Sequence, residues 1–378
     1  MKKLHFVLAA ILLLSVSATT EVNAQKSTAK KAATTAPAVP TPNVDSILFS
    51  EVKYRLVGPF RGGRSAAVTG SYVNNNTFYF GATGGGLWKT TDGGSNWKNL
   101  SDKKIGGNIG AIAVAPSDEN ILYVGEGENT MRGNVAEGLG GMWRSSDGGK
   151  TFTNIGLKEG RHVIRVIVHP RDPNTVWAAV VGHLFGPNTE RGVYKTTDGG
   201  KTWTRTLFVS DNTGISDLII DPSNPDILIA AAHQRRRHEF TYIGGGPESG
   251  LYKSTDGGLT WKEINAGLPK GDMGRIGLAI SSVDPSYVYA IVEARYDKGG
   301  VFRSTNKAES WSKQGGFSTS GNYYQEIFCD PKDVNKVFAM DTYMHHSTDG
   351  GKTFVPTGEK NKHVDNHCIW TDPNNTNH

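Results

Sequence analysis

Short apolar runs alternate with two kinds of turn along most of the chain. One apolar run leads into a proline-containing turn, as at 111–116, and a second run follows it, as at 121–124. A third run, such as 141–143, leads into a turn with two glycines. Proline fixes φ and ends a strand, whereas paired glycines tolerate positive φ. The pattern predicts a repeated unit of strand A, Pro turn, strand B, long loop, strand C, Gly-Gly turn and strand D.

The glycine turn recurs along the chain with the same internal spacing. Its first copy is Thr-Thr-Asp-Gly-Gly-Ser-Asn-Trp at 90–97, and successive copies are separated by 43 to 58 residues. The third residues of the six copies are Asp92, Asp147, Asp198, Asp256, Asn306 and Asp349. Their side-chain oxygens and the preceding hydroxyls can accept hydrogen bonds from turn amides, so we assign these six residues a structural role. Self-similarity at this period indicates a solenoid or a propeller.

Four antiparallel strands per repeat predict an all-β fold, a β-propeller of four-stranded blades. Alternation is weak in strands A and B, as expected where neighbouring blades cover both faces. A right-handed β-helix is the alternative, but it normally has shorter coils. Six turns predict six blades between about 62 and 355, and residues 367–373 open a seventh. An open propeller edge is a liability, so either residues 47–57 complete that blade or the chain is the N-terminal part of a larger propeller, which we favour.

The turn pattern Ser/Thr-x-Asp-x-Gly-x-Thr-Trp/Phe resembles the Asp-box, or BNR repeat, of sialidases, xyloglucanase-type glycosidases and sortilin-like Vps10 domains. Over residues 52–375 the chain is similar to secreted bacterial Asp-box propellers with a sortilin/Vps10-type N-terminal domain. This resemblance implies seven or more blades in the complete protein, up to the ten of sortilins. It does not fix the function, because these families share turns rather than active sites.

The first 43 residues differ in composition from the rest. Residues 1–24 have a basic start, an apolar stretch and a Val-Asn-Ala end, which predicts a secretory signal peptide. Residues 25–43 are rich in Lys, Ala, Thr and Pro and are predicted to be a disordered linker, leaving 44–378 as the propeller. We therefore expect an exported protein, in the periplasm, at the cell surface or outside the cell. No later apolar run is long enough to span a membrane.

Charge argues against a nucleic-acid partner. The whole chain carries a formal net charge of +5, and the first 43 residues, with five Lys and one Glu, account for +4 of it. The propeller is therefore close to neutral and offers no basic footprint for nucleic acid.

Antiparallel strands place the A–B turns and the Asp-boxes on one face and the B–C and D–A loops on the other. We expect the ligand site on the second face, because its loops are long, varied and polar. The candidates for ligand binding are Arg61, Arg64, Arg132, His183, Arg191, Arg295, Tyr323, His363 and His367. Such side chains suit a carboxylated or hydroxylated ligand. The alternative is that each is a solvated loop charge or locks neighbouring blades together.

Arg61 belongs to Pro-Phe-Arg-Gly-Gly-Arg at 59–64, which resembles the Phe-Arg-Ile-Pro motif of sialidases. There the arginine binds the substrate carboxylate. Gly-Gly replaces Ile-Pro in this chain, so a structural role for the loop is favoured. The alternating His363, Asp365 and His367 could ligate zinc, but their spacing matches no standard motif. We therefore predict neither a metal nor a cofactor.

Glycoside hydrolysis would require two carboxyl groups, about 5–5.5 Å apart for retention or 6.5–9.5 Å apart for inversion. The candidates on the ligand face are Glu126, Glu128, Glu190 and Glu293. The resemblance to xyloglucanases also implies a catalytic aspartate in the first blade, which Asp92 would match, with its partner carboxyl on a second propeller that has no counterpart here. We favour a module that binds a peptide or glycan at the propeller mouth, with a sialidase- or xyloglucanase-like hydrolase as the alternative.

Overall fold

The structure is a computed structural model that describes residues 62–129, 132 and 135–373. These residues belong to one compact unit, Gly58–His378. The predicted signal peptide, the linker, residues 47–57 and Arg61 lie outside the described residues.

Six four-stranded antiparallel sheets, each in simple sequential order, form six blades. Blade one contains β1 (Ser65–Gly70), β2 (Phe78–Ala82), β3 (Gly86–Thr90) and β4 (Lys98–Asn99). Blade two contains β5 (Ile109–Ala115), β6 (Asp118–Glu126), β7 (Met142–Ser145) and β8 (Thr153–Asn154). Blade three contains β9 (Val163–Val168), β10 (Val176–Val180), β11 (Gly192–Thr196) and β12 (Thr204–Leu207).

Blade four contains β13 (Thr213–Ile220), β14 (Leu228–Gln234), β17 (Gly250–Ser254) and β18 (Lys262–Glu263). Blade five contains β19 (Met273–Ile280), β20 (Val288–Ala294), β21 (Gly300–Ser304) and β22 (Ser312–Gly315). Blade six contains β23 (Ile327–Cys329), β24 (Val337–Ala339), β25 (His345–Ser347) and β26 (Val355–Pro356). A short hairpin, β15 (Arg236–Arg237) with β16 (Tyr242–Ile243), lies in the B–C loop of blade four.

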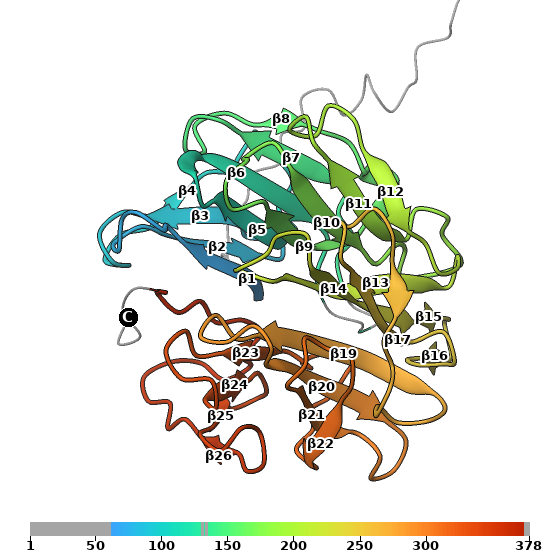
Figure 1. Cartoon of the computed structure of the whole chain (residues 1–378). Coiled ribbons are helices and arrows are strands. Elements are labelled where there is room, and N and C mark those ends of the chain that lie inside the picture. Colours follow the sequence, from blue (N-terminus) through green and yellow to red (C-terminus); the bar gives the residue numbers. More distant parts are fainter. Residues whose placement is uncertain (1–61, 130–131, 133–134, 374–378) are drawn as a thin grey trace, which may run out of the picture. The chain divides into compact units, whose positions relative to one another are not determined.

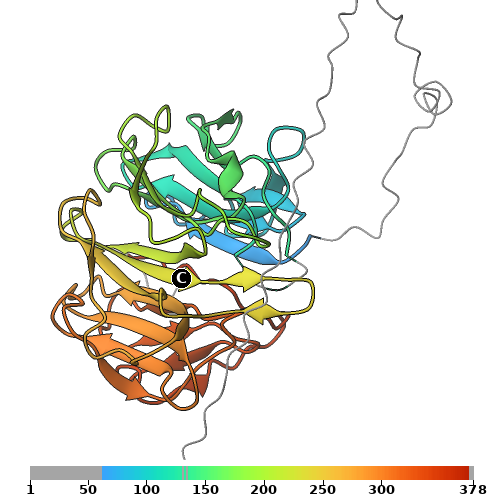
Figure 2. The same cartoon turned by 90° about the vertical axis from the view of Figure 1, so that its right-hand side faces the viewer.

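The blades surround a common centre, with the first strand of each blade innermost (Figure 1). Successive blades lie side by side, as the colour sequence in Figure 2 shows. Within the described residues the only helical element is a 3-10 turn, Lys158–Gly160. The all-β propeller prediction and its six blades are confirmed.

Apolar side chains between neighbouring blades form the core. Tyr79 of blade one packs in a cluster with Val114 and Leu122 of blade two. Tyr289 of blade five packs with Val337 of blade six, and its hydroxyl donates to the Val334 carbonyl at 2.8 Å. Each blade therefore buries one face against the next, at about 25 cal/mol for each Å² removed from water.

Residues 365–372 occupy the place between blades six and one. The amides of Asp365 and Asn366 donate to carbonyls of the blade-six loop. Trp370 meets Phe78 of blade one edge-on, with ring centroids 5.7 Å apart. The start of a seventh blade was predicted at this point, and the segment packs there without forming a hydrogen-bonded strand.

The repeated glycine turn closes on its own aspartate. The Thr260 amide and hydroxyl donate to Asp256 at 2.9 and 2.6 Å, and Ser254 donates to it at 2.7 Å. These bonds, led by the Thr260 hydroxyl, lower the pKa of Asp256 below its ordinary value. The Gly257 amide donates to the Asp226 carbonyl in the A–B turn of the same blade, so both turns share one face, as predicted.

Asp256→Ala is expected to lower the melting temperature by a few degrees without changing ligand affinity. The substitution leaves the Thr260 amide and hydroxyl without their acceptor, and the turn lies on the face away from the loops. Thermal melts followed by circular dichroism would measure the change, with Glu239→Ala in an exposed loop as the control. An unchanged melting temperature together with lost ligand binding would contradict the structural role of this turn.

Candidate functional site

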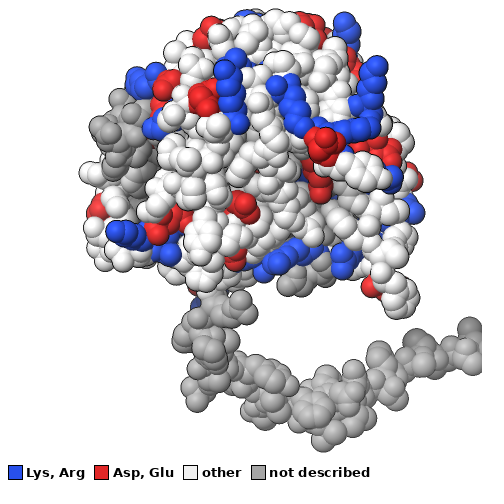
Figure 3. Space-filling view, turned by 90° about the horizontal axis from the view of Figure 1, so that it is seen from below, with Lys and Arg blue, Asp and Glu red and all other residues white. Residues whose placement is uncertain are grey.

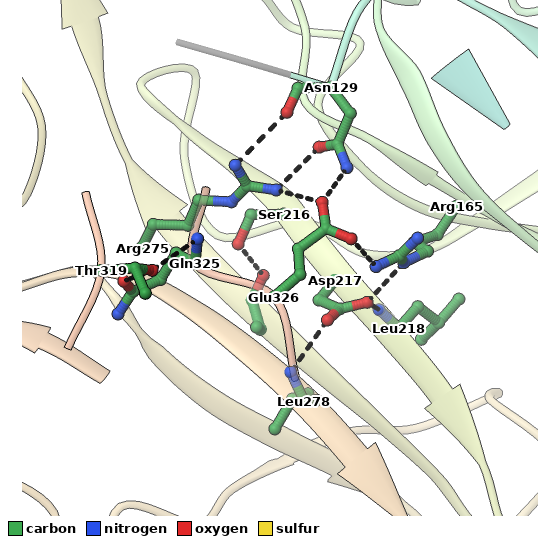
Figure 4. Close-up of polar contacts among 11 residues, drawn as sticks. Asn129, Arg165, Ser216, Asp217, Leu218, Arg275, Leu278, Thr319, Gln325 and Glu326 are labelled. Carbon is green, nitrogen blue, oxygen red and sulfur yellow. Dashed lines mark hydrogen bonds and ion pairs between the residues drawn. The ribbon is translucent and has the colours of Figure 1, made fainter. Parts of the chain in front are cut away.

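A buried polar network closes the centre of the propeller on the loop face (Figure 4). We call it the hub; it consists of Asn129, Arg165, Asp217, Arg275 and Glu326. Glu326 accepts from Arg165 at 2.9 Å and from Arg275 at 3.0 Å. Its side chain is only 3% exposed. One carboxylate therefore lies between two arginines from different blades.

The remaining hub contacts bring in two further blades. Asn129, in the B–C loop of blade two, donates to Glu326 at 2.6 Å and accepts from Arg275 at 2.9 Å. Asp217 of β13 accepts from Arg165 at 2.7 Å and from the Leu278 amide at 2.9 Å. Burial alone would lower the pKa of Arg165, but the two carboxylates raise it above its ordinary value. The hub thus joins blades two to six and leaves neither carboxylate free.

The channel at the centre of the propeller is mainly apolar. A cavity of about 600 Å³ is lined by the first strands of all six blades, including Ile112, Ile167 and Leu218. It extends to prolines of the A–B turns, such as Pro222, and Trp370 of the last segment also lines it. Arg165 and Asp217 of the hub contribute charged groups to the same wall.

An aromatic and charged cluster lies beside the hub on the same face. We call it the mouth cluster; its members are Arg64, Glu128, Arg132, Tyr323, Tyr324, Asp365 and His367. The Arg132 guanidinium carbon lies 3.8 Å from the centre of the Tyr323 ring. The Tyr323 ring centroid is 4.5 Å from that of His367 and 4.7 Å from that of Tyr324. Arg132 is exposed, so this stack borders the solvent.

Ion pairs and hydrogen bonds hold the mouth cluster in place. Arg64 forms a bidentate pair with Glu128, with one contact at 2.8 Å. The Tyr324 hydroxyl donates to Asp365 at 2.5 Å. Burial raises the pKa of Tyr323 and lowers that of His367, so at neutral pH the phenol keeps its proton and the imidazole is uncharged. Both rings are apolar faces with polar edges.

The predicted ligand residues divide into two groups. Arg64, Arg132, Tyr323 and His367 come together in the mouth cluster. The others lie outside this cluster. Arg191 is buried and donates to backbone carbonyls. Arg295 is an exposed loop residue, and His363 is exposed with its Nδ1 atom 2.7 Å from the Val364 carbonyl oxygen. His183 lies in blade three and offers its backbone carbonyl to Arg191 at 3.0 Å.

The predicted carboxylate candidates differ in how many hydrogen bonds they accept. Glu126 accepts four N–H bonds, three from backbone amides and one from the Trp143 indole. Glu190 accepts from the Tyr194 hydroxyl at 2.9 Å. Asp92 accepts from Asn96 within its turn, on the other face. Glu293 is different, because among the described residues its one donor is the Arg275 amide, at 3.1 Å.

Sequence analysis missed Arg165 and Asp217. Each stands inside an otherwise apolar first strand, Val-Ile-Arg-Val-Ile-Val and Thr-Gly-Ile-Ser-Asp-Leu-Ile-Ile. A charge at the centre of an apolar strand that faces the channel was the available signal. Among the described residues no group of three or more His, Cys, Asp or Glu side chains is arranged to hold a metal ion.

A protein-family model described as sortilin, neurotensin receptor 3 (Sortilin-Vps10) matches residues 140–267. The xyloglucanase Xgh74A of Acetivibrio thermocellus is 26% identical over 338 residues, covering 82% of this chain and 33% of the relative. A xyloglucanase from a Paenibacillus species is 26% identical over 308 residues, covering 72% of this chain and 29% of the relative. This chain is related to the xyloglucanase-type propellers.

Solved structures agree on the fold. An ancestral GH74 enzyme superposes with a TM-score of 0.58 at 20% identity, covering 77% of this chain and 37% of that one. A structure described as YCF48 bound to D1 peptide superposes with a TM-score of 0.51 at 15% identity, covering 78% of this chain and 82% of that one. The chain spans about a third of the length of the curated relatives it matches. In the described part of the chain, no helix has the length and apolar character needed to cross a membrane.

Proposed function

We propose that this propeller binds a carbohydrate at the mouth cluster. The observation that carries the proposal is the stack of Arg132 on Tyr323, with His367 against the same ring. Arg132 is the exposed member of this stack, and a guanidinium can donate to hydroxyl or carboxylate oxygens. The curated relatives named as xyloglucanases favour a carbohydrate as the ligand class.

Binding is favoured over hydrolysis because the mouth carboxylates already have partners. Glu128 is paired with Arg64, Glu326 lies between two arginines, and Asp365 accepts from Tyr324. Hydrolysis needs one carboxyl as an acid and a second as a base or nucleophile. A glycoside hydrolase remains the second candidate function, on the ground of the xyloglucanase relatives.

A peptide is the other ligand class for the same cluster. A solved propeller of the same fold is described as bound to a peptide, and Arg132 could pair with a peptide carboxylate.

Export is part of the proposal and rests on the leader-like residues 1–24. Figure 3 shows acidic and basic residues interspersed on one side of the molecule, without a continuous basic surface.

Arg132→Ala is expected to weaken binding of the preferred ligand about tenfold, or about 1.4 kcal/mol. The substitution removes an exposed cation and leaves the hub intact. A glycan array and a peptide library on the full-length chain would identify the ligand, and isothermal titration calorimetry would compare the affinities. Lys158→Ala, an exposed cation on the same face, is the matched control. Equal affinity of wild type and Arg132→Ala would place the ligand elsewhere.

A further inference from the structure

A second pocket lies on the loop face, between blades four and five. Its volume is about 480 Å³. We call it the Glu293 pocket; it is lined by Tyr242, Ile243, Gly244, Gly245, Asp272, Met273, Gly274, Glu293, Ala294 and Arg295. Three glycines leave backbone exposed along the wall, and the side chains supply two carboxylates, a phenol and a guanidinium. The pocket is therefore concave and polar.

Glu293 is held rigidly with most of its hydrogen-bonding capacity unused. Gly321 and Gly274 lie close to the carboxylate, since a Cβ at either position would be 2.0 or 2.3 Å from its Oε2 atom. Glu293 accepts one backbone amide, that of Arg275 at 3.1 Å, and has no ion-pair partner in the described part of the chain. A carboxylate has about four acceptor positions, so the remaining ones are left for a ligand or for water.

Tyr242 adds a second unsatisfied group to the same pocket. Its hydroxyl is buried and has no hydrogen-bond partner. Burial, together with the Glu293 charge, raises the pKa of Tyr242 to about 12, so the phenol keeps its proton. Buried polar groups normally have partners, so a buried hydroxyl without one in the described part of the chain is unusual.

The charges around the pocket exclude two ligand classes. Glu293 and Asp272 would repel an anion. Arg237 lies 5.7 Å from the Tyr242 ring, Arg295 is loosely paired with Asp272 at 3.9 Å, and Arg275 adjoins Glu293, so a cation is also disfavoured. A neutral ligand that donates hydrogen bonds fits the carboxylate of Glu293.

We propose that the Glu293 pocket is a second saccharide-binding subsite, in which hydroxyls of a neutral sugar ring donate to Glu293. That the ligand is a carbohydrate rests on the proposed function. The subsite adjoins the mouth: Arg275 donates its amide to Glu293 and its side chain to the hub, and Gly321 lies two residues before Tyr323. The two sites are therefore linked through Arg275.

Met273 provides a reporter at the wall of this pocket. The chain has six methionines, and Met273 lines the pocket. The full-length chain labelled with ¹³C-methyl methionine would be titrated with xyloglucan, cello-, manno- and chito-oligosaccharides, and the Met273 signal would be assigned with Met273→Leu. We expect at least one saccharide to shift this signal. Glu293→Gln should weaken the affinity measured from the shift by tenfold or more.

Two further variants keep the experiment decisive. Glu190→Gln, a carboxylate on the same face that already accepts from Tyr194, should leave the affinity unchanged. Asp272→Asn, at the partly exposed rim, should weaken it several-fold and provides the test if Glu293→Gln fails to fold. Wild-type affinity in both pocket variants, no Met273 shift with any saccharide, or a shift with butylammonium alone would overturn the proposal.

The mouth cluster can fail separately. A Met273 shift that is sensitive to Glu293→Gln, combined with no effect of Arg132→Ala, would uphold the subsite and reject the mouth cluster. Loss of affinity in Arg132→Ala without any Met273 shift would do the reverse.

Discussion

Glu326→Ala is expected to lower the free energy of unfolding by about 3–5 kcal/mol. The substitution leaves the buried Arg275 without a carboxylate, removes one of the two carboxylates of Arg165 and frees the Asn129 amide that donates to Glu326. An uncompensated buried charge costs far more than the loss of an exposed ion pair, for which the typical figure is about 0–1 kcal/mol. Urea denaturation followed by tryptophan fluorescence would measure the difference.

The matched control is Glu190→Ala, which removes a carboxylate whose described partner is the Tyr194 hydroxyl. A loss of about 1 kcal/mol is expected there, as for one ordinary hydrogen bond. If Glu326→Ala were no more destabilising than this control, the hub would not be a stabilising network, and its carboxylate would be available for chemistry.

Acidification below pH 6.5 is expected to destabilise the propeller well before its aspartates titrate. Burial, followed by nearby arginines such as Arg235, lowers the pKa of His162 and of His233 to about 3. Both imidazoles are therefore neutral in the folded state at pH 4.5, while in the unfolded chain they take up protons below pH 6.5. Stability that is fully present above pH 6.5 is lost as the pH falls towards 3.

At pH 4.5 each of these histidines should lower the free energy of unfolding by about 2–3 kcal/mol relative to pH 7, at 1.36 kcal/mol per pKa unit. The turn aspartates also destabilise the folded state on acidification, because their pKa values are lower in the folded state than in the unfolded chain. This loss begins only when the pH falls below the ordinary pKa of an aspartate. Melting temperatures between pH 7 and pH 4.5 would measure the effect. His162→Gln with His233→Gln should flatten the curve in this range, and an equally steep curve in that double variant would contradict the assignment.

The architecture could be predicted because the turn chemistry is local. Each copy of the turn contains its own acceptor and its own pair of glycines, so Asp256 and Gly257 indicate a hairpin without reference to the rest of the chain. The spacing between copies then sets the number of strands, and strand direction sets the two faces. The position of the Asp256 turn beside the A–B turn follows from this reasoning.

The centre of the site could not be predicted in the same way. Arg165, Asp217 and Glu326 meet only because three blades converge on one axis, and the register of each strand decides which side chain reaches it. A shift of one residue along a strand would turn each side chain to the opposite face. Arg191 illustrates the converse: it looked like a ligand-binding cation in the sequence, but the carbonyls of its own loop satisfy it.

The hub also has a consequence for the order in which the molecule assembles. Glu326 lies 197 residues from Asn129 and 161 residues from Arg165 along the chain. A ribosome therefore finishes the strands of five blades before the residue that neutralises their central arginines is made. Contacts of such long range form slowly, so we expect the network around Glu326 to form late, after blades two to five have been made. Addition of blade six then supplies Arg275 with its carboxylate and Arg165 with its second one.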